Sequence, residues 1–222
     1  MALPGGRDCS GSSGIKRDSV VHDPGTCVPM SLVIAFIGEC GAAIAGDTRE
    51  FITCGDRIPT ETLERELYSG QLVTDEDVEK RAGELGISMA IRDDKRKVTC
   101  REGILVGEVS ETHAGITKKR RLYATAGEYA LAEISGSGIR VTRKGKASAF
   151  VVLGNQITKK IAYSCIQENW KTGGIYDAIK IIMLSMKRAS DASASVSGSY
   201  DLIQTPLKVI LSDEIITNFL YF

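Results

Sequence analysis

The stretch "MSLVIAFIGECGAAIAGDTRE", residues 30–50, contains two apolar runs separated by a short turn. The runs occupy residues 32–37 and 42–44, and the turn between them contains glycine. Apolar runs of this length around such a turn are typical of a β-hairpin. A hairpin needs neither Ser31 in front of it nor Asp47 at its end, so these two polar residues require a separate explanation.

The chain of 222 residues is long enough for one domain with a sizeable core. Its hydrophobic content of 43% and charged content of 25% are those of an ordinary globular protein. The 28 basic and 28 acidic residues give a formal net charge of zero, so we expect no nucleic-acid partner. The basic run "KKRR" (118–121) is interpreted as a solvated loop. No stretch approaches the roughly 18 apolar residues of a membrane span, so we expect no membrane partner.

The cysteines and histidines do not form a metal-binding pattern. The six cysteines, at positions 9, 27, 40, 54, 100 and 165, contain no C-x-x-C pair, and the chain has only two histidines. The last four cysteines lie in or beside apolar segments, so we expect buried free thiols in a reducing compartment. Residues 1–30 lack the apolar region of a secretory signal. We therefore predict a cytoplasmic protein that uses neither a metal nor a cofactor.

Composition divides the chain into segments. Residues 1–30 are rich in Gly, Ser, Pro and charge, and are interpreted as a disordered extension, a propeptide or a mis-called start. Residues 31–206 are predicted to form the main domain. Within it, residues 59–86 are predicted to form two short, charged helices, and to be an insertion on its surface. The helix signals are the terminators Gly70 and Gly86 and a Thr74–Asp77 pattern close to a capping box. Residues 207–222 are predicted to hold a strand, "LKVIL", and an unassigned tail.

Strands and helices are segregated along the chain. Strand patterns follow the hairpin at residues 87–91, 96–100, 103–110, 121–127, 129–134, 138–145 and 147–154. Two amphipathic helices come next, and their apolar stripes consist of Ile157, Ile161 and Cys165 in the first and of Ile175, Ala178, Ile179, Ile182, Met183 and Met186 in the second. The strand pattern "YDLIQ" follows. This order favours an α+β protein over alternating βαβ units.

"SLVIAFIGECGAAIAGDTR" resembles the start of a mature proteasome β-subunit. In that family an N-terminal nucleophile begins the first strand, and an "(A/G)DTR" motif ends the next one. Asp47 lies sixteen positions after Ser31, which is the family's interval between nucleophile and catalytic aspartate. The resemblance implies an Ntn-hydrolase-like (proteasome β-subunit-like) αββα sandwich of two antiparallel sheets.

Further matches in chain order imply further site residues. "KRKVTCREGILVGEV" resembles the strand pair that begins with the catalytic lysine and ends at the oxyanion-hole glycine, which implies these roles for Lys97 and Gly107. The loop "MKRASDASASVSGSYDLI" resembles a serine-rich loop that braces the nucleophile, which implies that role for Ser195 and Ser197.

Two more residues are candidates for substrate binding. They are Arg49 of the "DTR" motif and Asn155 of the turn 154–156, which resembles a proteasomal Gly-Ser-Gly-type turn.

The chain also departs from the proteasome pattern. The helix pair that helps to build proteasome rings is replaced by "SETHAGITKKR" (110–120), so one helical layer is reduced and we expect a monomer instead of a ring. The connectases of methanogenic archaea have this architecture. "MSLVIAFIG", "AGDTRE", "ERELYSG", "LVGEVS" and "RRLYATAGEYA" resemble that family, whose members are protein ligases. The resemblance implies cleavage within an Asp-Pro-Gly-containing motif and transfer of the acyl part to another chain.

The chemistry implied by this resemblance requires Ser31 to be the first residue. A serine hydroxyl needs a base, and a terminal α-amino group has a pKa of about 7.7 to 8.0 that suits this task. Lys97 would favour the free amine and the developing alkoxide, and Asp47 would hold that lysine. The Gly107 N–H would stabilise the tetrahedral oxyanion.

Three functions remain open from the sequence. The first is a transpeptidase or protein ligase, for which the helices within 59–86 would grip the peptide and exclude water. The second is a proteasome-like peptidase or amidohydrolase in which water is the acceptor. The third is a non-catalytic binding module that retains residues 1–30 and therefore has a blocked Ser31. "HDPG" (22–25) resembles the ligase recognition motif, but such residues are also ordinary turn formers.

Overall fold

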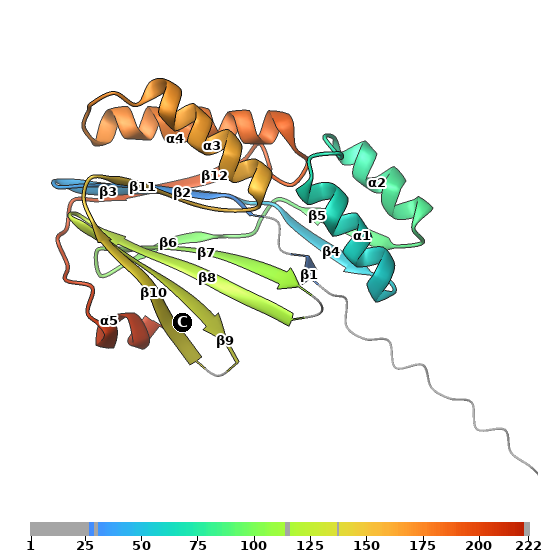
Figure 1. Ribbon diagram of the computed structural model, residues 1–222, viewed down its shortest axis with the longest axis horizontal. Coiled ribbons are helices and arrows are strands. Elements are labelled where there is room, and N and C mark those ends of the chain that lie inside the picture. Colours follow the sequence, from blue (N-terminus) through green and yellow to red (C-terminus); the bar gives the residue numbers. More distant parts are fainter. Residues whose placement is uncertain (1–26, 29–30, 114–115, 137, 220–222) are drawn as a thin grey trace, which may run out of the picture.

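The computed structural model describes residues 27–28, 31–113, 116–136 and 138–219. The chain forms a layered α+β structure whose described strand pairs are all antiparallel (Figure 1). The α+β organisation predicted from the segregated patterns is confirmed. The predicted order of strands, then two helices, then a strand is also confirmed.

The predicted hairpin lies at the centre of the molecule. It consists of β2 (Val33–Gly38) and β3 (Gly41–Asp47). The two strands pair from Val33 opposite Gly46 to Gly38 opposite Gly41. β11 (Ala149–Leu153) flanks β2, and β12 (Tyr200–Thr205) flanks β3. Nearly every residue of the hairpin is buried because this four-stranded sheet is covered on both faces.

A five-stranded sheet covers one face of the hairpin. Its order is β10-β9-β8-β7-β6, and the strands are β6 (Val98–Arg101), β7 (Ile104–His113), β8 (Ile116–Thr125), β9 (Glu128–Ser135) and β10 (Gly138–Lys146). The run "KKRR" belongs to β8, so its interpretation as a solvated loop is wrong. Arg121 is buried and donates to the Glu108 carboxylate and to the Phe219 carbonyl.

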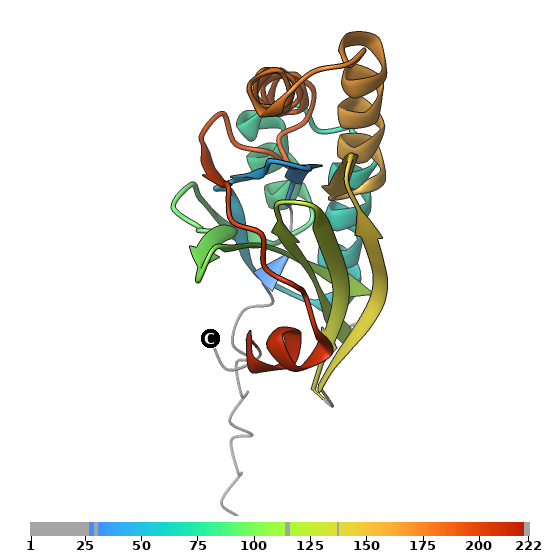
Figure 2. The same cartoon turned by 90° about the vertical axis from the view of Figure 1, so that its left-hand side faces the viewer.

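Helices α3 (Gln156–Asn169) and α4 (Ile175–Ala192) cover the other face of the four-stranded sheet (Figure 2). Their apolar stripes differ in detail from the prediction. Met183 is 46% exposed and lies outside the core, whereas Ala162 and Ile166 of α3 are buried.

Among the described residues, those that cover the outer face of the five-stranded sheet belong to the short helix α5 (Asp213–Asn218) and the segment before it (Figure 2). Leu211, Ile216 and Phe219 pack there against Tyr123 and its neighbours. The predicted reduction of one helical layer is therefore confirmed. The predicted strand "LKVIL" is wrong, because residues 206–211 have no regular strand. Isolated hydrogen bonds hold them to β8, to the turn after it, and to β9 and β10.

The insertion forms a body of its own beside the sandwich. It contains α1 (Arg57–Tyr68) and α2 (Asp75–Glu84), as predicted, with the Thr74–Asp77 capping box at the start of α2. A third sheet with the order β1-β4-β5 supports these helices; it consists of β1 (Cys27–Val28), β4 (Glu50–Cys54) and β5 (Ser88–Arg92). Phe51, Leu63, Leu67 and Val78 are among the residues of its separate core.

Other expectations are corrected or lie outside the described residues. Cys165 is buried as predicted, but Cys40, Cys54 and Cys100 are exposed. Cys27–Val28 pair with β4 instead of being disordered, and the remainder of residues 1–30, including the "HDPG" segment, lies outside the described part. Within the described residues, no helix has the length and apolar character needed to cross a membrane.

Candidate active site

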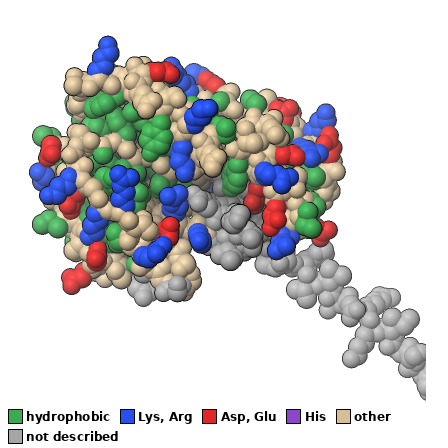
Figure 3. Space-filling view, viewed as in Figure 1, with side chains coloured by type: hydrophobic (Ala, Val, Ile, Leu, Met, Phe, Trp, Pro, Cys, Tyr) green, Lys and Arg blue, Asp and Glu red, His purple; other side chains and the backbone are tan. Residues whose placement is uncertain are grey.

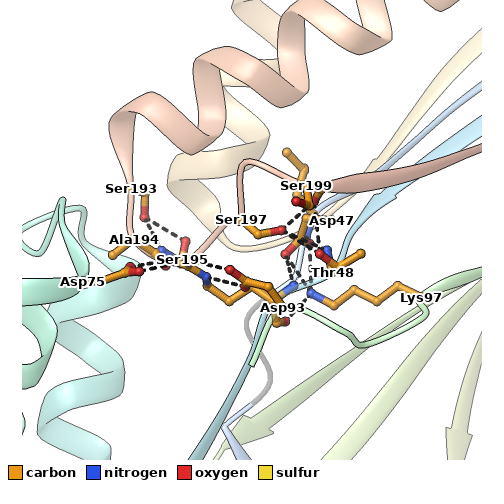
Figure 4. A network of polar contacts seen from close by, with 12 residues as sticks. Asp47, Thr48, Asp75, Asp93, Lys97, Ser193, Ala194, Ser195, Ser197 and Ser199 are labelled. Atoms are coloured by element: carbon orange, nitrogen blue, oxygen red, sulfur yellow. Dashed lines mark hydrogen bonds and ion pairs between the residues drawn. The ribbon is translucent and has the colours of Figure 1, made fainter. Parts of the chain in front are cut away.

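A buried ion pair joins the end of β3 to the start of β6. Lys97 Nζ lies 2.9 Å from each Asp47 carboxylate oxygen and also donates to the Arg49 carbonyl at 2.6 Å (Figure 4). The Asp47 and Lys97 side chains are 0% and 4% exposed. The structure thus brings together the two residues that the resemblance identified as catalytic lysine and aspartate.

The same carboxylate holds the chain next to Ser31. Asp47 Oδ1 accepts a hydrogen bond of 2.6 Å from the Leu32 N–H, and Oδ2 accepts one of 3.1 Å from the Arg49 N–H. The Leu32 carbonyl in turn accepts from the Asp47 N–H. Ser31 is 9% exposed and directly precedes this doubly bonded residue, so its backbone has a fixed position relative to the ion pair.

Burial dominates the electrostatics of the pair. Loss of water raises the pKa of Asp47, although the Lys97 ammonium and the backbone donors oppose this shift. Loss of water likewise lowers the pKa of Lys97, against the attraction of Asp47. A buried ion pair contributes little net stability because desolvation offsets the attraction between the charges, so such a pair points to a functional role.

The serine-rich loop after α4 braces the Asp47–Arg49 segment (Figure 4). Ser197 Oγ donates to the Ser199 carbonyl at 2.5 Å and lies 3.1 Å from both the Thr48 N and its hydroxyl. Ser195 Oγ lies 2.8 Å from Ser193 Oγ and is fully buried. Ser197 therefore contacts Thr48, which directly follows Asp47, the candidate catalytic aspartate.

Asn155 connects this loop to α3. Its Oδ1 accepts from the Thr158 N–H as the N-cap of α3, and its Nδ2 donates to Ser195 Oγ at 3.2 Å. The preceding Gly154 lies against the Ser31 carbonyl, since a Cβ on this glycine would come within 3.0 Å of that oxygen. The turn 154–156 thus lies beside Ser31, but both polar ends of the Asn155 side chain serve the protein itself.

Arg49 fastens the insertion to the sandwich. Its guanidinium donates to Asp93 through Nε and Nη2, to Asp75 of α2 through Nη1 and Nη2, and to the Ala194 carbonyl through Nη1. These five contacts match the five N–H donors of the group. The structure therefore gives Arg49 a positioning role and provides no support for the predicted substrate contact.

Gly107 lies inside β7, opposite Leu122 of β8. The N–H of the next residue, Glu108, donates at 2.9 Å to the carbonyl of Lys97, which directly precedes β6. Because successive residues of a strand direct their N–H groups to opposite sides, the Gly107 N–H faces β8. The structure does not support the predicted oxyanion role. It provides a packing reason for this glycine, because a Cβ would come within 2.7 Å of the side chains of Val33 and Ile44.

Several residues of this network had no recognisable signal in the sequence. Asp75 resembled an ordinary first-turn acid of α2, and Asp93 one member of the charged run "DDKRK". Thr48 belongs to the "DTR" motif, but its partner Ser197 lies 149 residues away. Among the described residues, no cluster of His, Cys, Asp and Glu is arranged to bind a metal.

The comparison with protein families decides the identity. Residues 30–218 match the family model described as Connectase MJ0548-like, N-terminal domain. The chain belongs to the connectase family. Membership implies a connectase-like protein ligase, and it agrees with the resemblance seen in the sequence. No curated protein matches this connectase significantly.

Several solved structures are similar to this connectase. Anbu from Yersinia bercovieri is 12% identical, with a TM-score of 0.38 over 79% of this chain and 81% of that one. Anbu from Pseudomonas aeruginosa is 12% identical, with a TM-score of 0.37 over 78% and 80%. HslV from Trypanosoma brucei is 17% identical, with a TM-score of 0.35 over 78% and 98%. These TM-scores are too low to carry an argument, so the assignment rests on the family match.

Proposed function

We propose that this connectase is a transpeptidase whose nucleophile is Ser31, exposed as the N-terminal residue by removal of residues 1–30. The observation that supports this most strongly is the buried Lys97–Asp47 pair, whose carboxylate also accepts the N–H next to Ser31. The pair fixes a charged group beside the start of β2, where attack on a peptide carbonyl would take place.

The proton of the Ser31 hydroxyl needs an acceptor. A free α-amino group on the same residue, with a pKa of about 7.7 to 8.0, is partly neutral near neutral pH, and it reaches the hydroxyl directly or through one water. The Lys97 ammonium favours the neutral amine and the developing alkoxide, and Asp47 holds the lysine in place. An upstream peptide turns the amine into an amide and thus removes the base.

The terminal amine also accounts for transfer. Attack of Ser31 Oγ on a substrate carbonyl forms an ester, and the released amine takes the proton removed from the hydroxyl. The Ser31 amine then displaces the ester oxygen and holds the acyl group as an amide. Reversal to the ester followed by attack of an incoming amine forms the new peptide bond and restores Ser31.

The substrate in this proposal is a peptide or protein with an Asp-Pro-Gly-type motif, as the family resemblance implies. We assign water exclusion to α1 and α2, since Arg49 fastens α2 beside the site through Asp75. We also propose that the enzyme is cytoplasmic and that it acts as a monomer. The monomer is supported by the continuous β7–β8 ladder, which stands in place of the ring-building helices of proteasomes.

The test mixes protein that begins at Ser31 with a labelled Asp-Pro-Gly peptide and a second peptide that carries a free amine, and follows both by mass spectrometry. We expect a ligated product and an acyl-enzyme mass. Ser31→Ala should abolish both, and Ser164→Ala, an exposed serine on α3, should change neither. Cleavage with only the hydrolysed product would favour the peptidase alternative, and no reaction at all would favour the binding module.

A further inference from the structure

A second concave site lies along β11, away from the Lys97–Asp47 pair. It is a groove of about 290 Å³ between α3 and the five-stranded sheet. Every residue of β11 lines this groove. The other lining residues come from β8, β9, β10 and α3, and they are Arg120, Tyr129, Leu131, Arg143, Lys159 and Tyr163.

The groove contains one edge of the four-stranded sheet, at which Ala149 and Phe150 are partly exposed and residues 151–153 are buried. Within the described part of the chain, β11 pairs only with β2, in a regular register from Ala149 opposite Ile37 to Leu153 opposite Val33. The outer side of an edge strand presents unpaired N–H and C=O groups, which proteins usually protect with charged residues, prolines or bulges. The β11 sequence "AFVVL" contains none of these protections. Its edge is therefore suited to pair with an extended peptide.

The walls of the groove are basic and aromatic. Arg143 lies over the Tyr129 ring, with its guanidinium carbon 6.0 Å from the ring centroid, and Lys159 lies in the first turn of α3. None of the described residues that line the groove is acidic. Figure 3 shows this face of the molecule, on which Lys and Arg side chains surround exposed hydrophobic ones. This combination favours an acidic partner with some apolar side chains.

We propose that the groove binds an acidic polypeptide segment in extended conformation, which adds to β11 as a further strand of the four-stranded sheet. This binding goes beyond the ligase function, because it requires neither a free Ser31 amine nor Lys97. It also has a consequence for that function. β11 is followed by Gly154, which lies against the Ser31 carbonyl, so a protein bound along β11 is held beside the candidate active site.

The test measures binding of a fluorescent peptide of about ten residues, alternating Glu with Val or Thr, to the full chain carrying Ser31→Ala. We expect saturable binding in a fluorescence anisotropy titration. The double variant Arg143→Glu/Lys159→Glu should weaken binding about tenfold or more, because it reverses the charge of the groove. The control is Lys160→Glu, the same charge reversal at an exposed neighbouring residue of α3 outside the groove, and it should bind like the parent.

A second peptide tests the strand pairing itself. N-methylation of alternate residues removes the N–H groups needed for a ladder but keeps the charge, and we expect it to abolish binding. Unchanged binding of the methylated peptide would overturn the strand-addition proposal. If Lys160→Glu weakens peptide binding as much as the double variant does, the peptide does not bind in the groove. If a short single-stranded DNA binds as tightly as the peptide, the groove is not specific for an acidic polypeptide. Unfolding midpoints of all variants establish that each one is folded.

Discussion

The Leu32 N–H donates to Asp47 Oδ1 at 2.6 Å, so the first residue after Ser31 is bonded to the last residue of β3. This bond closes the open end of the hairpin opposite its turn. The carboxylate that fixes the chain at Leu32 also binds Lys97, and therefore the position of Ser31 and the position of the cation cannot vary independently. The hairpin is thus part of the site as well as part of the core.

Removing one partner of the buried ion pair should be costly. Lys97→Met leaves the fully buried Asp47 carboxylate without its counter-ion, and we expect a loss of about 3–5 kcal/mol in the free energy of unfolding. Urea unfolding followed by circular dichroism measures this loss.

The double variant Asp47→Asn/Lys97→Met provides the control for this prediction. The substituted asparagine side chain carries no charge and retains an oxygen that accepts from the Leu32 N–H, so the double variant should be more stable than Lys97→Met alone. If the losses in the free energy of unfolding caused by Asp47→Asn alone and by Lys97→Met alone add up to the loss in the double variant, the two side chains do not act as a pair. Neither variant should ligate peptides.

Arg49 should hold the insertion onto the sandwich. Arg49→Lys keeps the charge but loses the two-pronged contacts to Asp93 and Asp75, and we expect a loss of about 2–3 kcal/mol. Relative to the parent protein, amide hydrogen exchange should become faster in α1 and α2 and stay unchanged in β2 and β3. Arg57→Ala is the control, because its ion pair with Glu61 is exposed and 3.7 Å long. Unchanged exchange in the insertion of the Arg49→Lys protein would contradict this role.

Stability should depend on the ionisation of Glu64 in α1. This residue is 8% exposed, and burial together with the nearby Glu61 raises its pKa to about 7 from an ordinary value of 4.5. The unfolded chain then loses the proton at lower pH than the folded one. The contribution of Glu64 is therefore complete below pH 4.5, declines as the pH rises to about 7, and is lost above it.

Glu64→Gln should remove this pH dependence. We expect the variant to be about 2–3 kcal/mol more stable than the parent at pH 8 and similar to it at about pH 4.5, as measured by thermal unfolding. Glu79→Gln on the exposed face of α2 is the matched control and should have no such effect. A Glu64→Gln protein that is no more stable than the parent at pH 8 would refute the assignment.

Two glycines should respond to alanine in opposite directions. A Cβ at Gly107 would approach Val33 and Ile44 to 2.7 Å, so Gly107→Ala should cost about 1–3 kcal/mol through overpacking. Gly83 lies inside α2 with no neighbouring atom within 4 Å of a new Cβ, so Gly83→Ala should stabilise by about 0.5–1 kcal/mol. Urea midpoints measure both, and an equal response at the two positions would contradict the packing explanation.

The features that could be predicted from the sequence are those encoded locally. The hairpin, the Thr74–Asp77 capping box and the helix-ending Gly70 and Gly86 each depend on a few adjacent residues. The interval from Ser31 to Asp47 is also local, because both residues lie at the open end of one hairpin.

The features that could not be predicted depend on long-range contacts. Arg49 resembled a substrate-binding residue until its partners, 26 and 44 residues away, became visible in the structure. The oxyanion role of Gly107 was inferred from its place in a motif, but β7 continues beyond it as one long strand. The apolar run at 207–211 resembled a strand, and its Val209 and Leu211 instead pack on the outer face of the five-stranded sheet.

The most direct test of the central claim compares two forms of the same protein in the ligation assay. One form begins at Ser31, and the other retains residues 1–30 with a substitution that prevents their removal; intact mass verifies both at the end of the reaction. We predict that only the form with a free Ser31 amine joins the Asp-Pro-Gly peptide to the second peptide. Equal ligation by the form whose mass still includes residues 1–30 would contradict the proposed mechanism.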